Sequence, residues 1–214
     1  RDLVRSRGLG DVYKRQVHKV GAGVLSADLC AYAALVGAVL TALLVLSWDQ
    51  TERGRKNRRD MAVVLCAAAF ACMPLLWRGV YDGHDLFFHL NRIEGIANGL
   101  RNGQFPVRMD PAIINEKGYP FSLMYSDVFL YPAAVLRILG FSLQTSYKVY
   151  VASITAATVG ITFYALRKMF RSDCAALLGT ALYTLSFYRL TNVFVRAAVG
   201  EYTAMAFLPL VVYG

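Results

Sequence analysis

The sequence predicts an all-α, polytopic membrane protein with an amphipathic interfacial helix in its first long outer loop. Hydrophobic residues make up 57% of the 214 positions and charged residues only 17%, so the chain is far more apolar than a water-soluble domain. Apolar runs that approach the roughly 20 residues needed to cross a bilayer lie at positions 29–48, 61–77, 147–166 and 174–190, and another begins at 204–213.

The first sixteen residues are not expected to belong to the fold. Residues 11–16 read DVYKRQ, which looks like the translation of an adapter used in sequencing libraries, so we interpret residues 1–16 as an artefact. They contain five basic and two acidic residues, and the formal net charge of +9 becomes +6 without them. The remaining charge lies in loops between apolar runs, which predicts a membrane orientation rather than binding to nucleic acid.

Two short basic stretches predict that orientation. Residues 51–60 and 167–171 both join apolar runs, and short cytoplasmic loops carry an excess of Lys and Arg. Both stretches can be cytoplasmic only if residues 121–139 do not cross the bilayer. That segment carries several polar and two charged side chains, so we expect it to lie in the interface or to re-enter. Residues 78–146 then form one long extracytoplasmic region.

A cluster of polar residues around Gly83 follows the apolar run at 61–77. It consists of Asp82, His84 and Asp85. Carboxylates are costly inside hydrocarbon but not at its edge, so two of them beside a flexible glycine predict a site. Asp82 lies outside the helix that follows, where capping does not require it. We expect Asp82 or Asp85 to act as a general base or to hold a divalent cation, the one cofactor that these residues suggest.

Residues 85–101 have the periodicity of an amphipathic helix. Apolar residues recur at steps of three and four, at Leu86, Leu90, Ile93, Ala97 and Leu100. Asp85 suits the N-cap position and shares one helix face with His89 and Arg92, an arrangement that could hold a phosphate and a proton donor together. The alternative is structural: Asp85 caps the helix, His89 packs at the interface and Arg92 reaches towards lipid phosphates.

Arg196 and Glu201 form a second charged group in a predicted outer loop. They are close enough in sequence to neutralise each other, and the alternative is that Arg196 contacts the pyrophosphate of a lipid. We expect the acidic groups of both outer loops, Asp82, Asp85 and Glu201, to converge on one cavity. The chain has no Gly-rich phosphate loop, nucleophile elbow or Cys/His metal spacing, so soluble nucleotide-dependent chemistry is not expected.

Four stretches of the chain carry a resemblance to known membrane proteins. They are DGHDLFFHLNRIEGIANGLRNGQFPVR at 82–108, GYPF from Gly118, RKMFRSD at 167–173 and SFYRLTNVFVRAAVGEYTAMAFLPL at 186–210. In this order they resemble bacterial membrane proteins of the YfhO-like and 6-pyruvoyl-tetrahydropterin synthase-related type. Those proteins look like members of the GT-C superfamily of polytopic glycosyltransferases. The pterin-synthase activity itself is not implied, because nothing here resembles the zinc-binding His triad of that enzyme.

The resemblance covers residues 61–214 and implies that they are the N-terminal part of a longer domain, truncated at its C-terminus. Residues 17–60 would be an additional N-terminal span with its basic loop. The resemblance also implies transfer of a sugar from a polyprenyl-phosphate donor at the outer face of the bacterial cytoplasmic membrane. An acidic residue of the first outer loop, by position Asp82 or Asp85, would be the base or the metal ligand.

We therefore expect a membrane glycosyltransferase fragment, inactive by itself, whose substrate contacts are His89, Arg92, Arg196 and Glu201. Arg92 or Arg196 would stabilise the leaving lipid phosphate. The alternative is a non-enzymatic carrier or flippase of lipid-linked saccharides, or an envelope-assembly protein. It explains the arginines equally well and the carboxylates less well, because carboxylates repel phosphate unless a cation bridges them. A secondary transporter is less favoured. It would need charged or helix-breaking residues near the middle of its spans, and only Gly160 and Gly179, with neighbouring Thr residues, approach that pattern.

Overall fold

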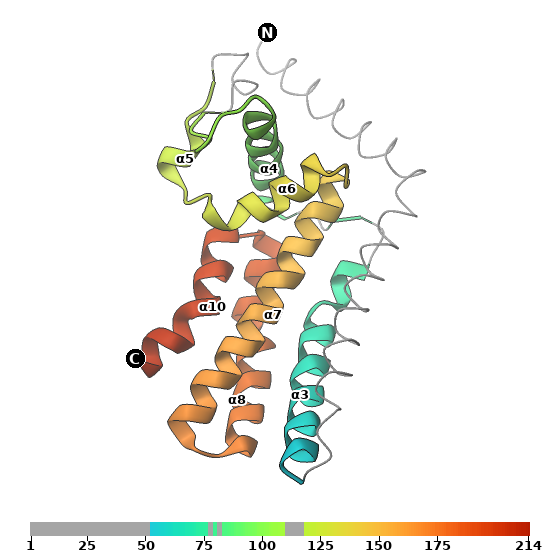
Figure 1. Ribbon diagram of the computed structural model, residues 1–214, viewed down its shortest axis with the longest axis vertical. Coiled ribbons are helices and arrows are strands. Elements are labelled where there is room, and N and C mark those ends of the chain that lie inside the picture. The colour runs from blue at the N-terminus through green and yellow to red at the C-terminus, as the bar shows by residue number, and fades with distance from the viewer. Residues whose placement is uncertain (1–51, 77–78, 81–82, 110–117) are drawn as a thin grey trace.

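The computed structural model describes residues 52–76, 79–80, 83–109 and 118–214. All regular elements in these ranges are helical, as the sequence predicts, and no β-strand occurs within them. Figure 1 shows a bundle of α3 (Glu52–Ala71), α7 (Leu143–Phe170), α8 (Asp173–Thr184) and α10 (Val199–Tyr213), with a cap of α4 (Leu86–Arg101), α5 (Phe121–Met124) and α6 (Tyr131–Ile138) at one end. The predicted artefact at 1–16 and the apolar run at 29–48 lie outside the described residues.

The basic stretch at 51–60 was expected to be a loop, and this expectation is wrong, because α3 already begins at Glu52. Glu, Arg and Lys are strong helix formers, so the charged residues extend the helix of the apolar run that follows them. α3 ends at Ala71, and the short 3-10 helix η2 (Met73–Leu76) follows. Pro74 in η2 has no backbone N–H, so it cannot make the hydrogen bond that would continue an α-helix. α3 packs against α7 and α8.

α4 confirms the predicted amphipathic helix, since it runs from Leu86 to Arg101. The buried residues of the predicted stripe are Leu86, Leu90, Ile93 and Ala97. His89 and Arg92 are buried as well, so the helix is enclosed on more sides than the stripe predicts. Gly99 allows the loop after α4 to pack closely, because a Cβ at that position would lie 2.5 Å from Cγ1 of Val107. The hydrophobic core lies where α4, α6, α7 and α10 meet.

Residues 121–139 form no continuous membrane-spanning helix. They divide into α5, the 3-10 helix η3 (Val128–Leu130) and α6, of which α6 is the longest with 8 residues. Tyr125 is extended and Pro132 stands in the first turn of α6, so one helix cannot run through the segment. Because a crossing needs about 20 residues, this geometry agrees with the orientation expected from the basic stretches.

α7 is the one helix among the described residues that is long and apolar enough to cross a membrane. Its 28 residues extend well beyond the predicted run at 147–166. At its N-terminus the Ser142 hydroxyl accepts a hydrogen bond from the Thr145 N–H at 3.0 Å. At its C-terminus Arg171 adopts a left-handed conformation with φ of 50° and turns the chain into α8. A membrane protein with several spans therefore remains a prediction.

The predicted span at 174–190 is not one helix. α8 ends at Thr184 after 12 residues, and α9 (Phe187–Thr191) and the π-helix η4 (Asn192–Arg196) lead the chain into α10. The Thr184 carbonyl accepts a hydrogen bond from Nη1 of the buried Arg189 at 3.3 Å. In a continuous helix that carbonyl would accept a hydrogen bond from a backbone N–H of the next turn. Here the buried Arg189 guanidinium donates to it instead, at the point where α8 ends.

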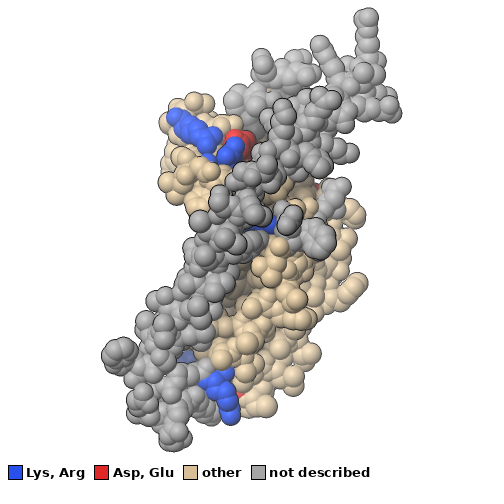
Figure 2. All heavy atoms as spheres, turned by 90° about the vertical axis from the view of Figure 1, so that its right-hand side faces the viewer, with Lys and Arg blue, Asp and Glu red and all other residues tan. Residues whose placement is uncertain are grey.

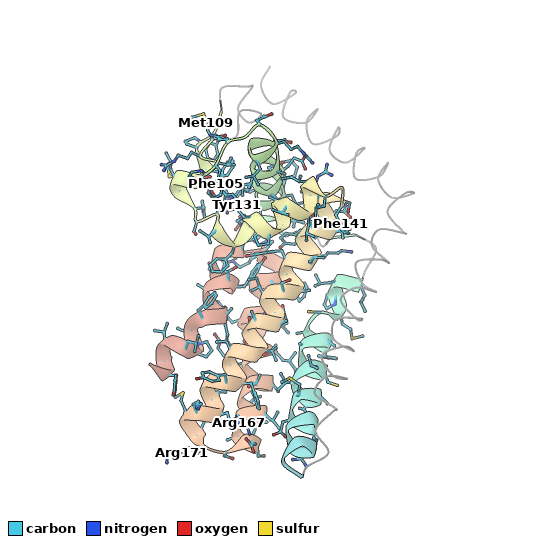
Figure 3. The ribbon with its side chains drawn as sticks, in the orientation of Figure 1. Phe105, Met109, Tyr131, Phe141, Arg167 and Arg171 are labelled. Carbon is cyan, nitrogen blue, oxygen red and sulfur yellow. The ribbon has the colours of Figure 1, made fainter. Side chains whose placement is uncertain are left out.

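The basic stretches gather at the end of the bundle opposite the cap. The start of α3 and the turn between α7 and α8 lie at this end in Figure 1, and Figure 3 shows Arg167 and Arg171 there as well. On the face drawn in Figure 2, Lys and Arg of the described residues appear near the two ends and in one small patch between them, and the remaining described surface of the middle is largely uncharged. Such a distribution suits a bundle whose middle lies in an apolar layer.

Candidate functional site

Two of the predicted motifs meet at the capped end of the bundle. The His84 N–H donates to the Val195 carbonyl at 3.2 Å, and the Asp85 N–H donates to the Arg196 carbonyl at 3.0 Å. Gly83 permits this approach, because a Cβ there would lie 2.9 Å from Cβ of Ala197. The loop before α4 and the end of η4 are therefore joined through their backbones, although more than a hundred residues separate them in sequence.

Arg196 and Glu201 form the ion pair that the sequence allows. Nη1 and Nη2 of Arg196 each donate to a different carboxylate oxygen of Glu201, and both distances are 2.8 Å. Nη1 also donates to Oδ1 of Asn192 at 2.7 Å, and the Tyr188 hydroxyl donates to Glu201 at 3.2 Å. The Arg196 and Glu201 side chains are 39% and 44% exposed. A bidentate guanidinium at this exposure is accessible to an anion that competes with the carboxylate.

Asp85 stands at the N-cap of α4, as expected, but its side chain makes no capping hydrogen bond. Asp85 is also exposed, so its carboxylate is accessible and does not accept a hydrogen bond from the first N–H groups of α4. Asp82 lies outside the described residues, so its place relative to Asp85 and Glu201 stays a prediction.

Arg92 is buried and bound within the cap, so it does not reach towards lipid phosphates, which was the alternative expected for this residue. Its Nη2 donates to Oδ1 of Asp127 at 2.6 Å and to the Ser126 carbonyl at 3.0 Å. The guanidinium also lies over the rings of Phe88, Phe121 and Tyr125, at 5.3 to 6.0 Å from their centroids. Only 1% of the Arg92 side chain is exposed, so a lipid phosphate would have to displace Asp127 to reach it.

His89 is also buried and is held in its neutral form. Desolvation, together with the charge of Arg92, lowers the pKa of His89 to about 4. Nη1 of Arg92 lies 3.2 Å from Nδ1 of His89. Arginine can only donate hydrogen bonds, so Nδ1 accepts and the proton of the neutral ring is on Nε2. Of the predicted row Asp85, His89 and Arg92, only the last two are therefore in contact.

The described residues alone do not provide a complete site for a divalent cation. No group of three or more His, Cys, Asp or Glu side chains occurs among them. The predicted ligands were Asp82 and Asp85, of which the described part of the chain contains only Asp85. Glu201 is the acidic residue of the motif that meets the loop of Asp85, and both of its carboxylate oxygens accept hydrogen bonds from Arg196.

Sequence reasoning missed two residues, one of which organises the cap and the other the helical bundle. Asp127 was counted only as part of the polar content of 121–139, although its carboxylate is the partner of Arg92. Arg189 is buried, and its Nη2 donates to the Thr155 hydroxyl at 3.1 Å. The signal for both was a charged side chain within an apolar segment, since such a side chain needs a buried partner.

Comparisons with known proteins identify no family for this chain. No family model matches it, and no solved structure matches it. An uncharacterized protein of Lactococcus lactis subsp. cremoris (strain MG1363) is 23% identical over 158 residues, which is 71% of this chain and 25% of the relative. The chain thus spans about a quarter of the length of the curated relative that it matches.

Proposed function

We propose that the chain is part of a polytopic membrane glycosyltransferase that takes a sugar from a polyprenyl-phosphate donor at the extracytoplasmic face. The observation that supports this most directly is the backbone contact between the loop at Gly83–Asp85 and the end of η4 at Arg196. An exposed carboxylate, Asp85, and an accessible guanidinium, Arg196, therefore stand on neighbouring backbone. A carboxylate can act as the base for an acceptor hydroxyl, and a guanidinium can stabilise a leaving phosphate.

The proposed orientation follows from the charge at the two ends of the bundle. The start of α3 and the turn after α7 carry the basic stretches, and these favour the cytoplasmic side. The cap and the site then lie on the extracytoplasmic side, with α7 crossing the bacterial cytoplasmic membrane between them. The bilayer and a lipid-linked sugar are the partners in this proposal.

In the proposed reaction the acceptor hydroxyl attacks the anomeric carbon of the donor sugar. The hydroxyl proton passes to the carboxylate of Asp85 or Asp82, a new C–O bond forms, and the bond from the sugar to the lipid phosphate breaks. The electron pair of that bond leaves on the phosphate, where Arg196 stabilises the negative charge. Glu201 holds the guanidinium in place before the phosphate arrives and is displaced by it.

His89 and Arg92 have a supporting role in this proposal. Arg92 ties α4 to the segment before α6 through Asp127. Since both side chains are buried and already bonded, they position the helix that follows Asp85 rather than contact the substrate. Arg196 is then the guanidinium that meets the lipid phosphate.

A carrier or flippase of lipid-linked saccharides, or an envelope-assembly protein, is the alternative function. One observation favours it: among the described residues at this site Asp85 is the one exposed carboxylate not already bound to a guanidinium, whereas Arg196 is accessible. A carrier needs the guanidinium for a phosphate and needs no base.

The test is sugar transfer by the complete protein from a labelled polyprenyl-phosphate sugar. We expect the Asp82→Asn, Asp85→Asn double variant to lose turnover and to keep donor binding, because the base is lost and Arg196 remains. Arg196→Gln should weaken donor binding. Asp173→Asn removes a carboxylate from the opposite end of the bundle and serves as the matched control. Normal turnover by the double variant would contradict the assignment of Asp82 or Asp85 as the base, and binding by the wild-type protein without turnover would favour the carrier.

A further inference from the structure

An apolar groove lies between α7, α8 and α10, near the basic end of the bundle and away from the candidate site. Its volume is about 300 Å³, and its walls are almost entirely apolar. Leu166 and Phe170 of α7, Gly179 of α8, and Leu208 and Val212 of α10 are among its lining residues. Tyr183 also lines it, but its hydroxyl donates to the Met205 carbonyl at 2.7 Å. Apart from the buried hydroxyl of Thr162, which has no hydrogen-bond partner among the described residues, the groove therefore offers contact area rather than hydrogen bonds.

The side chains around this groove are large, apolar and open to the surroundings. Phe170 is 58% exposed, Leu208 is 49% exposed and Val212 is 64% exposed. Apolar side chains gathered at this exposure mark an interaction site in a water-soluble protein and a lipid contact in a membrane protein. Because α7 is long and apolar enough to span a bilayer, hydrocarbon is the surrounding medium that fits these residues.

The shape and walls of the groove suit a hydrocarbon chain. Its volume of about 300 Å³ lies at the lower end of the size range of ligand pockets. The groove is open to the surroundings and its walls are almost entirely apolar, so a flexible acyl chain can lie along it without making hydrogen bonds.

Positive charge at one end of the groove favours a negatively charged headgroup. Arg171 directly follows the groove residue Phe170 and is exposed, and no ion pair of Arg171 occurs among the residues that the structure describes. Figure 3 shows Arg171 at the tip of the turn between α7 and α8. Lys168 is exposed one turn earlier, whereas Arg167 is bound to Asp173 at 2.7 Å. Basic residues beside a space between membrane helices bind anionic lipid headgroups.

We propose that this groove binds one acyl chain of an anionic phospholipid, whose headgroup contacts Arg171 and Lys168 on the cytoplasmic leaflet. The inference rests on the proposed membrane placement of α7 and is independent of sugar transfer. The lipid fills the gap between the end of α10 and the turn after α7. It thereby holds the basic end of the bundle at the membrane surface.

The test is native mass spectrometry of the detergent-purified complete protein, delipidated and then mixed with phosphatidylglycerol or phosphatidylcholine. We expect a one-lipid adduct with phosphatidylglycerol and a weaker one with phosphatidylcholine. Arg171→Gln should lower the preference for phosphatidylglycerol about fivefold, the effect of one basic residue near an anionic surface. Arg101→Gln removes an exposed arginine from the cap and is the control for charge.

A second pair of variants tests the groove itself. Val212→Trp fills the groove and should weaken binding of both lipids, whereas Val211→Trp changes the neighbouring exposed residue, which does not line the groove. Circular dichroism establishes whether each variant is folded. If Val212→Trp does not fold, Arg171→Gln remains as the test, because it changes only a surface residue. The proposal is overturned if the wild-type chain retains no lipid, if both lipids bind equally, or if each variant matches its control. Lack of retained lipid would leave the groove to a protein helix.

Discussion

Arg92 joins α4 to the segment that precedes α6 through a single guanidinium group. Its bonds to Asp127 and to the Ser126 carbonyl connect residues that are more than 30 positions apart in sequence. Both charged side chains are almost completely enclosed, with 1% and 8% exposed. A buried pair of this kind adds little stability compared with apolar residues, but loss of one partner leaves the other charge buried and unpaired.

Arg92→Ala should therefore lower the free energy of unfolding by about 3 to 5 kcal/mol. Arg101→Ala, on the exposed side of the same helix, should cost less than about 1 kcal/mol. The measurement is denaturant unfolding in detergent, followed by circular dichroism. The double variant Arg92→Leu, Asp127→Leu should be more stable than Arg92→Ala, because it leaves no unpaired charge. A double variant as unstable as the single one would contradict this account.

His89 gives the cap a dependence on pH. Its pKa of about 4 in the folded protein lies below the unfolded value of 6.5, so protonation favours the unfolded chain. Stability from the neutral ring is fully present above pH 6.5 and is lost as the pH falls towards 4, by about 3 kcal/mol in total. Unfolding measured across this range should show the loss in the wild-type chain and less of it in His89→Gln. An equal loss of stability in the wild-type chain and in His89→Gln would contradict this account.

At the scale of elements, two glycines allow neighbouring segments of the cap to pack closely. Gly99 of α4 lies against Val107, and Gly83 lies against Ala197 at the end of η4. Ala197 itself has a φ of 55°, which is uncommon for a residue with a side chain. The π-helix before it and this left-handed residue direct the Arg196 carbonyl towards the loop before α4. Irregular helical turns of this kind are frequent at functional sites.

Gly99→Ala should destabilise the protein by about 1 to 3 kcal/mol, because the new Cβ would overlap with both methyl groups of Val107. Gly160→Ala is the matched control in α7, where no atom lies within 4 Å of the added Cβ. That change should be neutral or stabilising by up to about 1 kcal/mol, since alanine is the better helix former. Thermal unfolding of the two variants in detergent measures the difference, and equal effects would show that the contact with Val107 does not matter.

At the scale of the whole molecule, the cap and the basic turn lie at opposite ends of α7. If α7 crosses the membrane, Gln104 in the cap and Lys168 at the basic end must face different compartments. Single cysteines at these two exposed positions, in a chain without its native cysteines, should react with an impermeant maleimide from opposite sides. Labelling of both positions from the same side would contradict the proposed orientation.

The helical class and the position of α4 could be predicted because both depend on local patterns. Apolar content and the three-and-four spacing of Leu86, Leu90 and Ile93 are properties of the sequence, and α4 begins and ends where the pattern does. The bounds of the other helices were harder to predict. Burial of Arg189 divides the run at 174–190, and an apolar pattern does not indicate where a buried guanidinium will find its acceptors.

The candidate site could be predicted only in part, for the same reason. The Arg196–Glu201 pair is local, and its partners are five residues apart. The partner of Arg92 is 35 residues away, and several acidic residues compete for that role in the sequence. Which carboxylate pairs with Arg92 depends on which one is buried beside the guanidinium in the folded chain.

The amino-acid sequence by itself determined the helical class, the apolar span of α7 and the basic charge at one end, because composition and short-range periodicity control these properties. Only the tertiary structure decided that the loop at Gly83–Asp85 contacts the turn at Arg196, and that Arg92 forms an ion pair with Asp127. Contacts between distant segments depend on packing volume and on the desolvation of charge. Both are properties of the folded chain rather than of any stretch of it.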